Sequence, residues 1–352
     1  MSQSQDQSEF FRGTANVGTT FKDGKSVDGS STKAVPAFIF GEELADLADH
    51  DDRIVVLTAD LARSNRSSDF AERHPERFFN TGIAEKNMIS IAAGLAASGR
   101  ISFAATFSAF AALLGCEQIR TDCAYPHLPV RVVGHHSGIS MGFYGTSHHS
   151  LEDIGIMRTI ADLTVVCATD ANHLRAILRA SLNHDGAMYI RLGRGRDPEV
   201  YDKVPKLSFG KSIKLRSGSD LAIVATGSEV YPSLEAATRL AQSGINASVY
   251  DFYSLKPFDF DSLAEIASHG NILTVEEHNR TNGLGTAFAE ALLDGGLGHT
   301  RLYRHGVPDI HVPIGPPAAL YAHYRLDANG IFEVANEFLG VNSKQTYAKG
   351  LN

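Results

Sequence analysis

Residues 101–136 read ISFAATFSAFAALLGCEQIRTDCAYPHLPVRVVGHH, with a short apolar run on either side of a longer helical pattern. The stretch predicts a strand at 101–107, a helix at 108–125 and a second strand at 129–136. The same alternation begins at 53–60 and continues to about residue 193. Short β-branched strands that alternate with helices form a parallel sheet covered on both faces, so the sequence predicts an α/β fold.

A polar segment without helical periodicity, which contains Pro198 and Pro205, interrupts the alternation. Strand-like runs and helical segments resume at 220–226. A chain of 352 residues is long enough for two domains, and we expect each to hold a mainly parallel sheet flanked by helices. The predicted parts are a flexible N-terminal arm at 1–33, a first domain at 34–195, a linker at 196–215 and a second domain at 216–352.

Composition argues against several classes of protein. A formal net charge of −8 and the lack of a lysine or arginine run argue against a nucleic-acid binder. No apolar stretch is long enough to cross a membrane, and the N-terminus lacks the features of a secretory signal. Cys116, Cys123 and Cys167 lie in apolar segments and fit buried, reduced thiols. The sequence therefore predicts a cytoplasmic protein.

A histidine-rich stretch at 134–149, GHHSGISMGFYGTSHH, begins at the end of the predicted strand 129–136 and continues beyond it. It leaves the carboxyl end of that strand, where parallel sheets bind ligands. Histidine ligates metals and also transfers protons, so both chemistries are open from the residues alone. Because neighbours on a strand point to opposite faces, we do not expect His135 and His136 to ligate one ion together. One histidine from each end of the stretch can still face a common cleft and contact a substrate.

Other candidate residues each have a structural and a functional interpretation. Glu85 begins a predicted helix, where a carboxylate complements the helix dipole. Phe107 and Phe110 share one helical face, which is typical of a hydrophobic core. Arg191 and Arg194 follow a predicted strand and can grip an anion, although surface arginines are common.

The order of several motifs resembles the thiamine diphosphate-dependent transketolase family over about residues 35–340. The motifs are TADLARSN (58–65), FNTGIAEKNM (79–88), ATFSAFA (105–111), SLEDIGIMRTI (150–160), VATGSEV (224–230) and VEEHNRTNGLG (275–285). The resemblance covers the pyrimidine-binding and C-terminal domains of a transketolase. The family's G-D-G…N motif, which holds the diphosphate through a divalent metal, does not occur in the sequence.

This resemblance implies a split enzyme. A separate N-terminal subunit would hold the diphosphate of thiamine diphosphate together with Mg²⁺ or Ca²⁺, while this chain would contribute no metal ligand. Each active site would form between the two kinds of chain in an α2β2 heterotetramer. The implied reaction transfers a two-carbon ketol unit between sugar phosphates.

The resemblance also implies roles in cofactor binding. Glu85 would hydrogen-bond the aminopyrimidine and promote its imino tautomer, whose nitrogen takes the proton that leaves the thiazolium carbon and creates the ylide. To do so, Glu85 must carry or share a proton in a desolvated site. Phe107 and Phe110 would form an aromatic wall against the pyrimidine, with Leu113 at the next expected aromatic position. Asp60 would lie close to the thiazolium.

On the substrate side, His136 and His148 match the loop histidines that contact the hydroxyls of the donor ketose. His135 and His149 are expected to be structural. Ser64 and Arg194 match positions that contact the acceptor phosphate.

Two departures from the family pattern bear on specificity. Tyr144 stands where the family has an aspartate that reads the C2 hydroxyl, and Thr32, beside Lys33, replaces an arginine that contacts phosphate. Tyrosine is bulkier and uncharged but can still form hydrogen bonds. We therefore expect a non-standard sugar phosphate.

Three alternatives remain from the sequence. Within the superfamily, the chain could instead be like a deoxyxylulose-phosphate synthase or the E1 β subunit of a 2-oxoacid dehydrogenase, but the segment at 150–160 favours transketolase. A non-catalytic, partner-binding α/β protein is the second alternative, although the presence of Glu85 and His136 argues against it. A metallohydrolase rests on the histidines alone and is the weakest.

Overall fold

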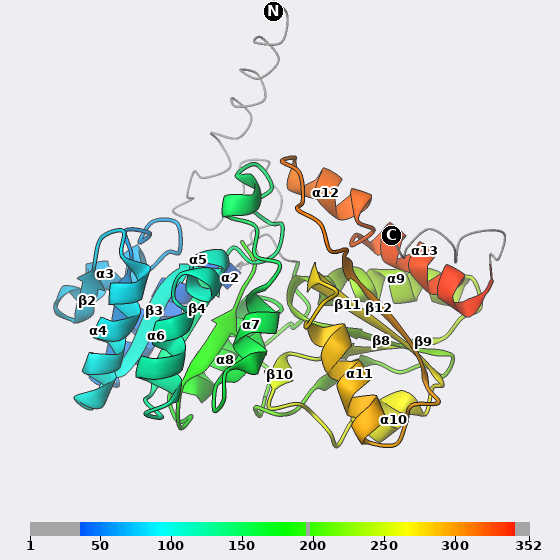
Figure 1. Cartoon of the computed structure of the whole chain (residues 1–352), viewed down its shortest axis with the longest axis horizontal. Coiled ribbons are helices and arrows are strands. Elements are labelled where there is room, and N and C mark those ends of the chain that lie inside the picture. The colour runs from blue at the N-terminus through cyan, green and yellow to red at the C-terminus, as the bar shows by residue number, and fades with distance from the viewer. Residues whose placement is uncertain (1–35, 195–197, 342–352) are drawn as a thin grey trace, which may run out of the picture.

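The computed structural model describes residues 36–194 and 198–341. Two sheets, each flanked by helices, lie side by side (Figure 1). The predicted α/β class with two mainly parallel sheets is therefore confirmed. The expected arm at 1–33, with Thr32 and Lys33, lies outside the described residues.

The first sheet has the strand order β10-β5-β6-β4-β3-β1-β2, and all neighbours are parallel except β10 and β5. Its central strands are buried along their whole length, as the continuous apolar runs of the sequence predict. The strands are β1 (Ile54–Thr58), β2 (Phe78–Asn80), β3 (Ile101–Phe107), β4 (Val130–His135), β5 (Thr164–Cys167), β6 (Met188–Arg191) and β10 (Ser254–Lys256).

Helices cover both faces of this sheet because side chains alternate along each strand. Val55 packs in one core cluster with residues of α4, α5, η2 and α7, while Val56 packs in another with residues of α2, α3 and α8. The helices are α2 (Pro36–Ala48), α3 (Ser68–Arg73), η1 (Pro75–Arg77), α4 (Glu85–Ala97), α5 (Ser108–Leu113), α6 (Cys116–Gln118), η2 (Ile119–Ala124), η3 (Gly145–Ser147), α7 (Asp153–Thr159) and α8 (Ala171–Ser181).

The single helix predicted at 108–125 is wrong, since the segment is divided among α5, α6 and η2. Gly115 lies where α5 ends and the chain passes close to α4. A Cβ at this position would lie 2.3 Å from Cδ1 of Ile89 and 2.9 Å from the carbonyl oxygen of Ala111. Close packing against another helix sets this break, and no periodicity within the segment predicts it.

The second sheet has the order β12-β11-β8-β9-β7, with β7 antiparallel to β9. β7 begins at Ile213, inside the segment expected to be a linker. The strands are β7 (Ile213–Arg216), β8 (Leu221–Ala225), β9 (Ala247–Asp251), β11 (Asn271–Asn279) and β12 (Arg301–Val307). The helices are η4 (Gly227–Glu229), α9 (Val230–Gln242), α10 (Leu263–Ala267), α11 (Leu284–Asp294), α12 (Pro317–His323) and α13 (Ala328–Leu339).

The two halves interlock. β10 follows β9 in the chain but pairs with β5 of the first sheet, and it lies between the two halves in Figure 1. The backbone N–H of Gly315 donates to the carbonyl of Gly142 at 3.0 Å, which joins the segment before α12 to the histidine-rich stretch. Within 36–194 and 198–341, no helix combines the length and apolar character needed to cross a membrane.

Candidate functional site

The candidate residues of the first half gather at the carboxyl edge of the first sheet. Thr58 of β1 is in register with both Asn80 of β2 and Ala105 of β3, and Phe107 is in register with His135 of β4. Because these strands are parallel, the segments that follow them leave from one edge. Asp60, Glu85 and His136 all lie within a few residues of that edge.

Glu85 is the first residue of α4, and its side chain is buried, with 7% of its surface exposed. The hydroxyl of Thr106, at the end of β3, donates to Oε1 of Glu85 over 3.5 Å. A buried carboxylate normally accepts several shorter hydrogen bonds. This long contact leaves acceptor capacity for a donor from outside the described residues.

Five aromatic side chains form a cluster at the same edge of the sheet, which we call the aromatic cluster: Phe107, Phe110, His136, Tyr144 and His148. The ring of Phe107 lies 5.5 Å from that of Phe110, 4.7 Å from that of His136 and 5.5 Å from that of His148. His148 also contacts Phe110 at 5.3 Å and Tyr144 at 4.8 Å. The two phenylalanines therefore contact the histidine-rich stretch and do more than fill a core.

His136, which contacts Phe107 of this cluster, has an unusual backbone conformation. Its φ of +57° turns the chain out of β4, and its Nδ1 has no hydrogen-bond partner among the described residues. Burial, with a further contribution from the positive charge of Arg194 and from repulsion against a protonated His148, lowers the pKa of His136 to about 3. The imidazole is neutral at pH 7 and can both donate and accept a hydrogen bond.

The two histidines of the first pair have different ring neighbours. His135 contacts Phe40 of α2 at 4.9 Å, whereas His136 contacts Phe107 at 4.7 Å. His149 is buried, with 5% of its surface exposed. Across residues 36–194 and 198–341, no three His, Cys, Asp or Glu side chains are grouped so that they could hold a metal ion.

Other predicted residues lie around the cluster. Asp60 is exposed, has a φ of +60°, and its N–H donates to Oδ1 of Asn80 at 3.0 Å. Ser64 is exposed in the loop before α3. Arg194 is half-buried, and its charge acts on His136. Arg191 is paired within the protein, since its Nε donates to Oδ2 of Asp153 at 2.7 Å and both side chains are buried.

A residue of the second half also reaches this region. Oε1 of Glu277, in β11, accepts from the backbone N–H of Ile139 at 2.8 Å. No residue of the second half was expected from the sequence to take part in chemistry, so this contact was missed. Two adjacent glutamates inside an apolar strand, in NILTVEEHN, were the available signal, because buried carboxylates require specific partners.

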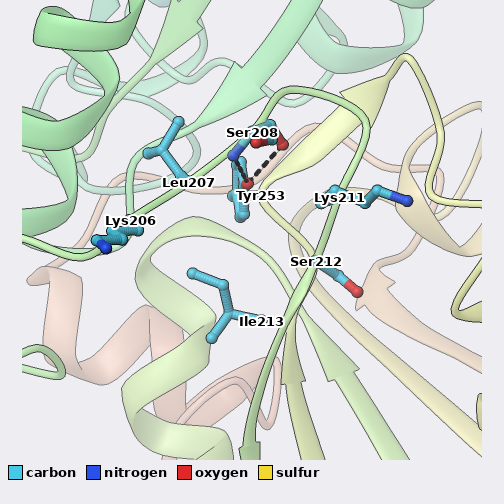
Figure 2. Close-up of a pocket in the computed structure, with 7 residues that line it drawn as sticks. All are labelled: Lys206, Leu207, Ser208, Lys211, Ser212, Ile213 and Tyr253. Carbon is cyan, nitrogen blue, oxygen red and sulfur yellow. Dashed lines mark hydrogen bonds between the residues drawn. The ribbon is translucent and has the colours of Figure 1, made fainter.

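A hollow of about 230 Å³ lies away from the cluster, between the segment before β7 and the end of β9 (Figure 2). Its central polar group is already paired: the Tyr253 hydroxyl accepts from the N–H of Ser208 at 3.1 Å and donates to its carbonyl at 2.7 Å. Lys211 at its rim pairs with Asp261. The connecting segment itself forms most of the wall of this hollow, and we assign the hollow no chemistry.

Comparison with known proteins gives matches over most of the chain. The model of the transketolase pyrimidine-binding domain matches residues 37–198, and that of the transketolase C-terminal domain matches residues 210–331. One of the subunits of the apulose-4-phosphate transketolase of Phocaeicola vulgatus is 36% identical over 302 residues, which cover 85% of this chain and 96% of that one. The chain belongs to the transketolase family.

Within the transketolase family, the chain is similar to subunits of split enzymes. The 6-deoxy-6-sulfo-D-fructose transketolase subunit SqwH of Clostridium sp. is 39% identical over 295 residues, covering 84% of this chain and 91% of that one. A solved split-gene transketolase, described as an inactive β4 tetramer, is 38% identical with a TM-score of 0.80, covering 88% of this chain and 99% of that one. 1-Deoxy-D-xylulose-5-phosphate synthases are also similar, but this chain spans about half their length. The chain thus extends over nearly the whole length of two subunits of split transketolases, and as a member of the transketolase family it is a transferase.

Transketolases depend on thiamine diphosphate, and the described residues of this transketolase chain fit the pyrimidine end of that cofactor. Glu85 offers a buried acceptor, and Phe107 and Phe110 offer ring faces at the same edge of the sheet. The buried, unpartnered Nδ1 of His136 calls for a polar group from outside the described residues.

Proposed function

We propose that this chain completes a thiamine diphosphate site together with a diphosphate-binding N-terminal subunit and transfers a two-carbon unit between non-standard sugar phosphates. The observation that carries the proposal is the position of Glu85, a buried carboxylate at the carboxyl edge of the first sheet, where the strands that lead to the aromatic cluster also end. We further propose that residues 34–195 and 216–352 act as two domains, joined by 196–215.

In this proposal, residues of the first half hold the cofactor. Glu85 shares a proton with a ring nitrogen of the aminopyrimidine, while Phe107 and Phe110 pack on that ring. Asp60, at the neighbouring strand end, lies toward the thiazolium side. When bound, thiamine diphosphate supplies a nucleophilic carbon and an electron sink for the two-carbon unit.

The sugar phosphate would bind on the side of the histidines. His136 and His148 are expected to hydrogen-bond donor hydroxyls, and a neutral His136 can accept a proton from one of them. Ser64 and Arg194 are expected to contact the phosphate of the acceptor. Burial also lowers the pKa of His148, so the two imidazoles can lie close together without two like charges.

Exposed apolar side chains close in the chain to the candidate residues Glu85 and Phe110 support a partner chain. Ile83 is 85% exposed immediately before α4, and Leu113 at the end of α5 is 57% exposed. Large exposed apolar groups near a site mark interaction surfaces. We propose that this surface contacts the subunit that holds the diphosphate and Mg²⁺ or Ca²⁺, within an α2β2 heterotetramer.

The buried thiols support a cytoplasmic location. Cys116, Cys123 and Cys167 are free; Cys116 is only partly buried, contrary to the expectation, whereas Cys123 and Cys167 are buried, which raises the pKa of each to about 12. Such thiols are unreactive and fit a reducing compartment.

The direct test is reconstitution. The chain mixed with its N-terminal subunit, thiamine diphosphate and Mg²⁺ is expected to transfer two-carbon units from a ketose phosphate, whereas either subunit alone is expected to be inactive. Chelation of the metal should abolish transfer, and added Mg²⁺ or Ca²⁺ should restore it. If the assembled complex binds the cofactor but transfers nothing from a panel of ketose phosphates, the non-catalytic alternative gains instead.

Tyr144 offers a test of substrate choice, since it is 57% exposed and packs on His148. Tyr144→Asp is expected to shift the ratio of kcat/KM toward common pentose and hexose ketose phosphates by about 10- to 100-fold, the usual worth of a hydrogen bond that one substrate makes and another lacks. Parallel kcat/KM measurements on both classes check this. Tyr144→Phe, which keeps the ring, is the control, and equal specificity in all forms would exclude Tyr144 as the determinant.

A further inference from the structure

The two ends of the histidine loop, residues 136–150, are joined by backbone hydrogen bonds. The N–H of Gly138 donates to the carbonyl of Ser150 at 3.1 Å, and the N–H of Ser150 donates back to the carbonyl of Gly138 at 2.8 Å. His136 lies two residues before Gly138, and His148 lies two residues before Ser150. The way in which this closure is held therefore sets the orientation of both histidines.

Glu277 of the second sheet lies against this closure and is 1% exposed. Its Oε1 accepts from the N–H of Ile139 at 2.8 Å and from the hydroxyl of Tyr321 at 2.5 Å, and its Oε2 accepts from the hydroxyl of Ser228 at 2.9 Å. All three partners are donors, as a carboxylate requires. The histidine loop is thus joined to β11, α12 and η4 through one side chain.

Gly138 allows the carboxylate to sit directly on the loop backbone. Its φ is +60°, and a Cβ at this position would lie 2.1 Å from Cδ of Glu277. Only glycine combines this backbone conformation with such a close approach. The loop sequence is therefore built around the carboxylate of Glu277.

A second tie connects the backbone of Glu277 with the other strand of the closure. Nη2 of Arg191 donates to the carbonyl of Glu277 at 2.9 Å and to the carbonyl of Ser150 at 3.3 Å. Next to it, the N–H of Asn279 donates to the carbonyl of Leu151 at 3.0 Å. Both ends of the histidine loop are consequently fixed to the end of β11.

We propose that Glu277 is a positioning residue for two-carbon transfer: it fixes the base of the histidine loop so that His136 and His148 face one cleft. This inference rests on the proposed function of those histidines. Burying a carboxylate is costly, and an apolar side chain of similar size would fill the same space at lower cost. What the carboxylate adds is a fixed acceptor for the N–H of Ile139, which no apolar side chain supplies.

The neighbouring Glu276 provides a matched control. It lies on the same strand, is 0% exposed, and its oxygens accept from the N–H groups of Leu284 at 2.6 Å and Gly285 at 2.9 Å, at the start of α11. Successive side chains on a strand point to opposite faces, so Glu276 points away from the loop. Glu276→Ala removes a buried carboxylate without removing the loop contact.

The experiment compares Glu277→Ala, Glu277→Gln and Glu276→Ala in the full chain assembled with its N-terminal subunit. In hydrogen exchange followed by mass spectrometry, peptides spanning 136–150 should exchange about 10- to 100-fold faster in Glu277→Ala, the usual worth of a hydrogen bond to a charged group. Glu276→Ala should leave these peptides protected. Glu277→Gln should restore most of the protection, because its amide oxygen still accepts from Ile139.

Kinetics give the second readout. Glu277→Ala should lower kcat/KM for the donor ketose by about 10- to 100-fold while the affinity for thiamine diphosphate stays unchanged, and Glu277→Gln should recover most of the rate. A folded Glu277→Ala variant with normal loop protection and normal kcat/KM would overturn the proposal. The same loop-specific loss in Glu276→Ala would overturn it too.

The two proposals fail separately. If the wild-type complex transfers no two-carbon units, the proposed function is wrong, while the exchange experiment still decides whether Glu277 holds the loop. If Glu277→Ala does not fold, Glu277→Asp takes its place, because it keeps the charge but withdraws the carboxylate from the N–H of Ile139 by one methylene. Faster exchange of the loop in that variant would support the proposal, and unchanged exchange would overturn it.

Discussion

Glu85→Gln is expected to lower kcat for two-carbon transfer by about 10²- to 10⁴-fold in the assembled enzyme, the range typical of lost general acid–base catalysis. Glutamine keeps the size of the side chain and can still form hydrogen bonds, but it cannot give up or take a proton. The loss should appear in kcat more than in the KM of either sugar. Steady-state rates at saturating thiamine diphosphate measure it.

The unfolding free energy of the variant distinguishes a catalytic role of Glu85 from a purely structural role at the start of α4. A negative charge in the first turn of α4 stabilises the helix dipole by about 0.3–1 kcal/mol, so Glu85→Gln should unfold in urea nearly as the wild type does. Glu265→Gln is the matched control, because Glu265 also lies in a first helical turn, in α10, and is exposed there. Equal activity in Glu85→Gln and Glu265→Gln would mean that Glu85 serves the helix alone.

Much of the fold could be predicted because its strands are short, continuously apolar and separated by helices. β1, β3, β4 and β8 lie within a few residues of their predicted places. β10 and the edge strand β12 were not foreseen. β10 has three residues and exists because it pairs with β5, and the outer part of β12 is exposed and charged, so neither shows a burial pattern in the sequence.

The sequence predicted some residues of the candidate site but not their partners. Helical periodicity alone predicts that Phe107 and Phe110 belong to the hydrophobic core. Only the resemblance to the transketolase family predicted that they lie in the same site as the histidines. The contact between Ile139 and Glu277 spans 138 residues, and that between Asp153 and Arg191 spans 38. Partners so far apart are chosen by tertiary packing, so no local pattern in the sequence reveals them.

Asp153→Asn is expected to destabilise the protein by about 3–5 kcal/mol, because it leaves a buried cation without its counter-ion. Arg191 and Asp153 are 2% and 0% exposed, and Nε of Arg191 lies 2.7 Å from Oδ2 of Asp153, which also accepts from the hydroxyl of Tyr189 at 2.8 Å. Urea unfolding of wild type and variant at neutral pH measures the difference in free energy.

The pH dependence of this pair has a definite sign. Burial alone raises the pKa of Asp153, but the charges of Arg191 and His278 outweigh it and hold this pKa below its usual value. The carboxylate therefore contributes stability above the unfolded-state pKa of about 4, and this contribution is lost as the pH falls through the folded-state pKa. Asp153→Asn should lack this part of the acid dependence.

Two comparisons make the Asp153 result specific to a buried charge. Glu290→Gln breaks the pair between Arg158 and Glu290, in which Glu290 is 58% exposed, and should cost at most about 1 kcal/mol. Adding Arg191→Met to Asp153→Asn removes the stranded cation and should recover part of the lost stability. If the double variant instead loses the sum of the unfolding free energies that the two single variants lose, Asp153 and Arg191 are not coupled. The contribution of Arg191 would then come from its hydrogen bonds to the carbonyls of Glu277 and Ser150, which stabilise the base of the histidine loop.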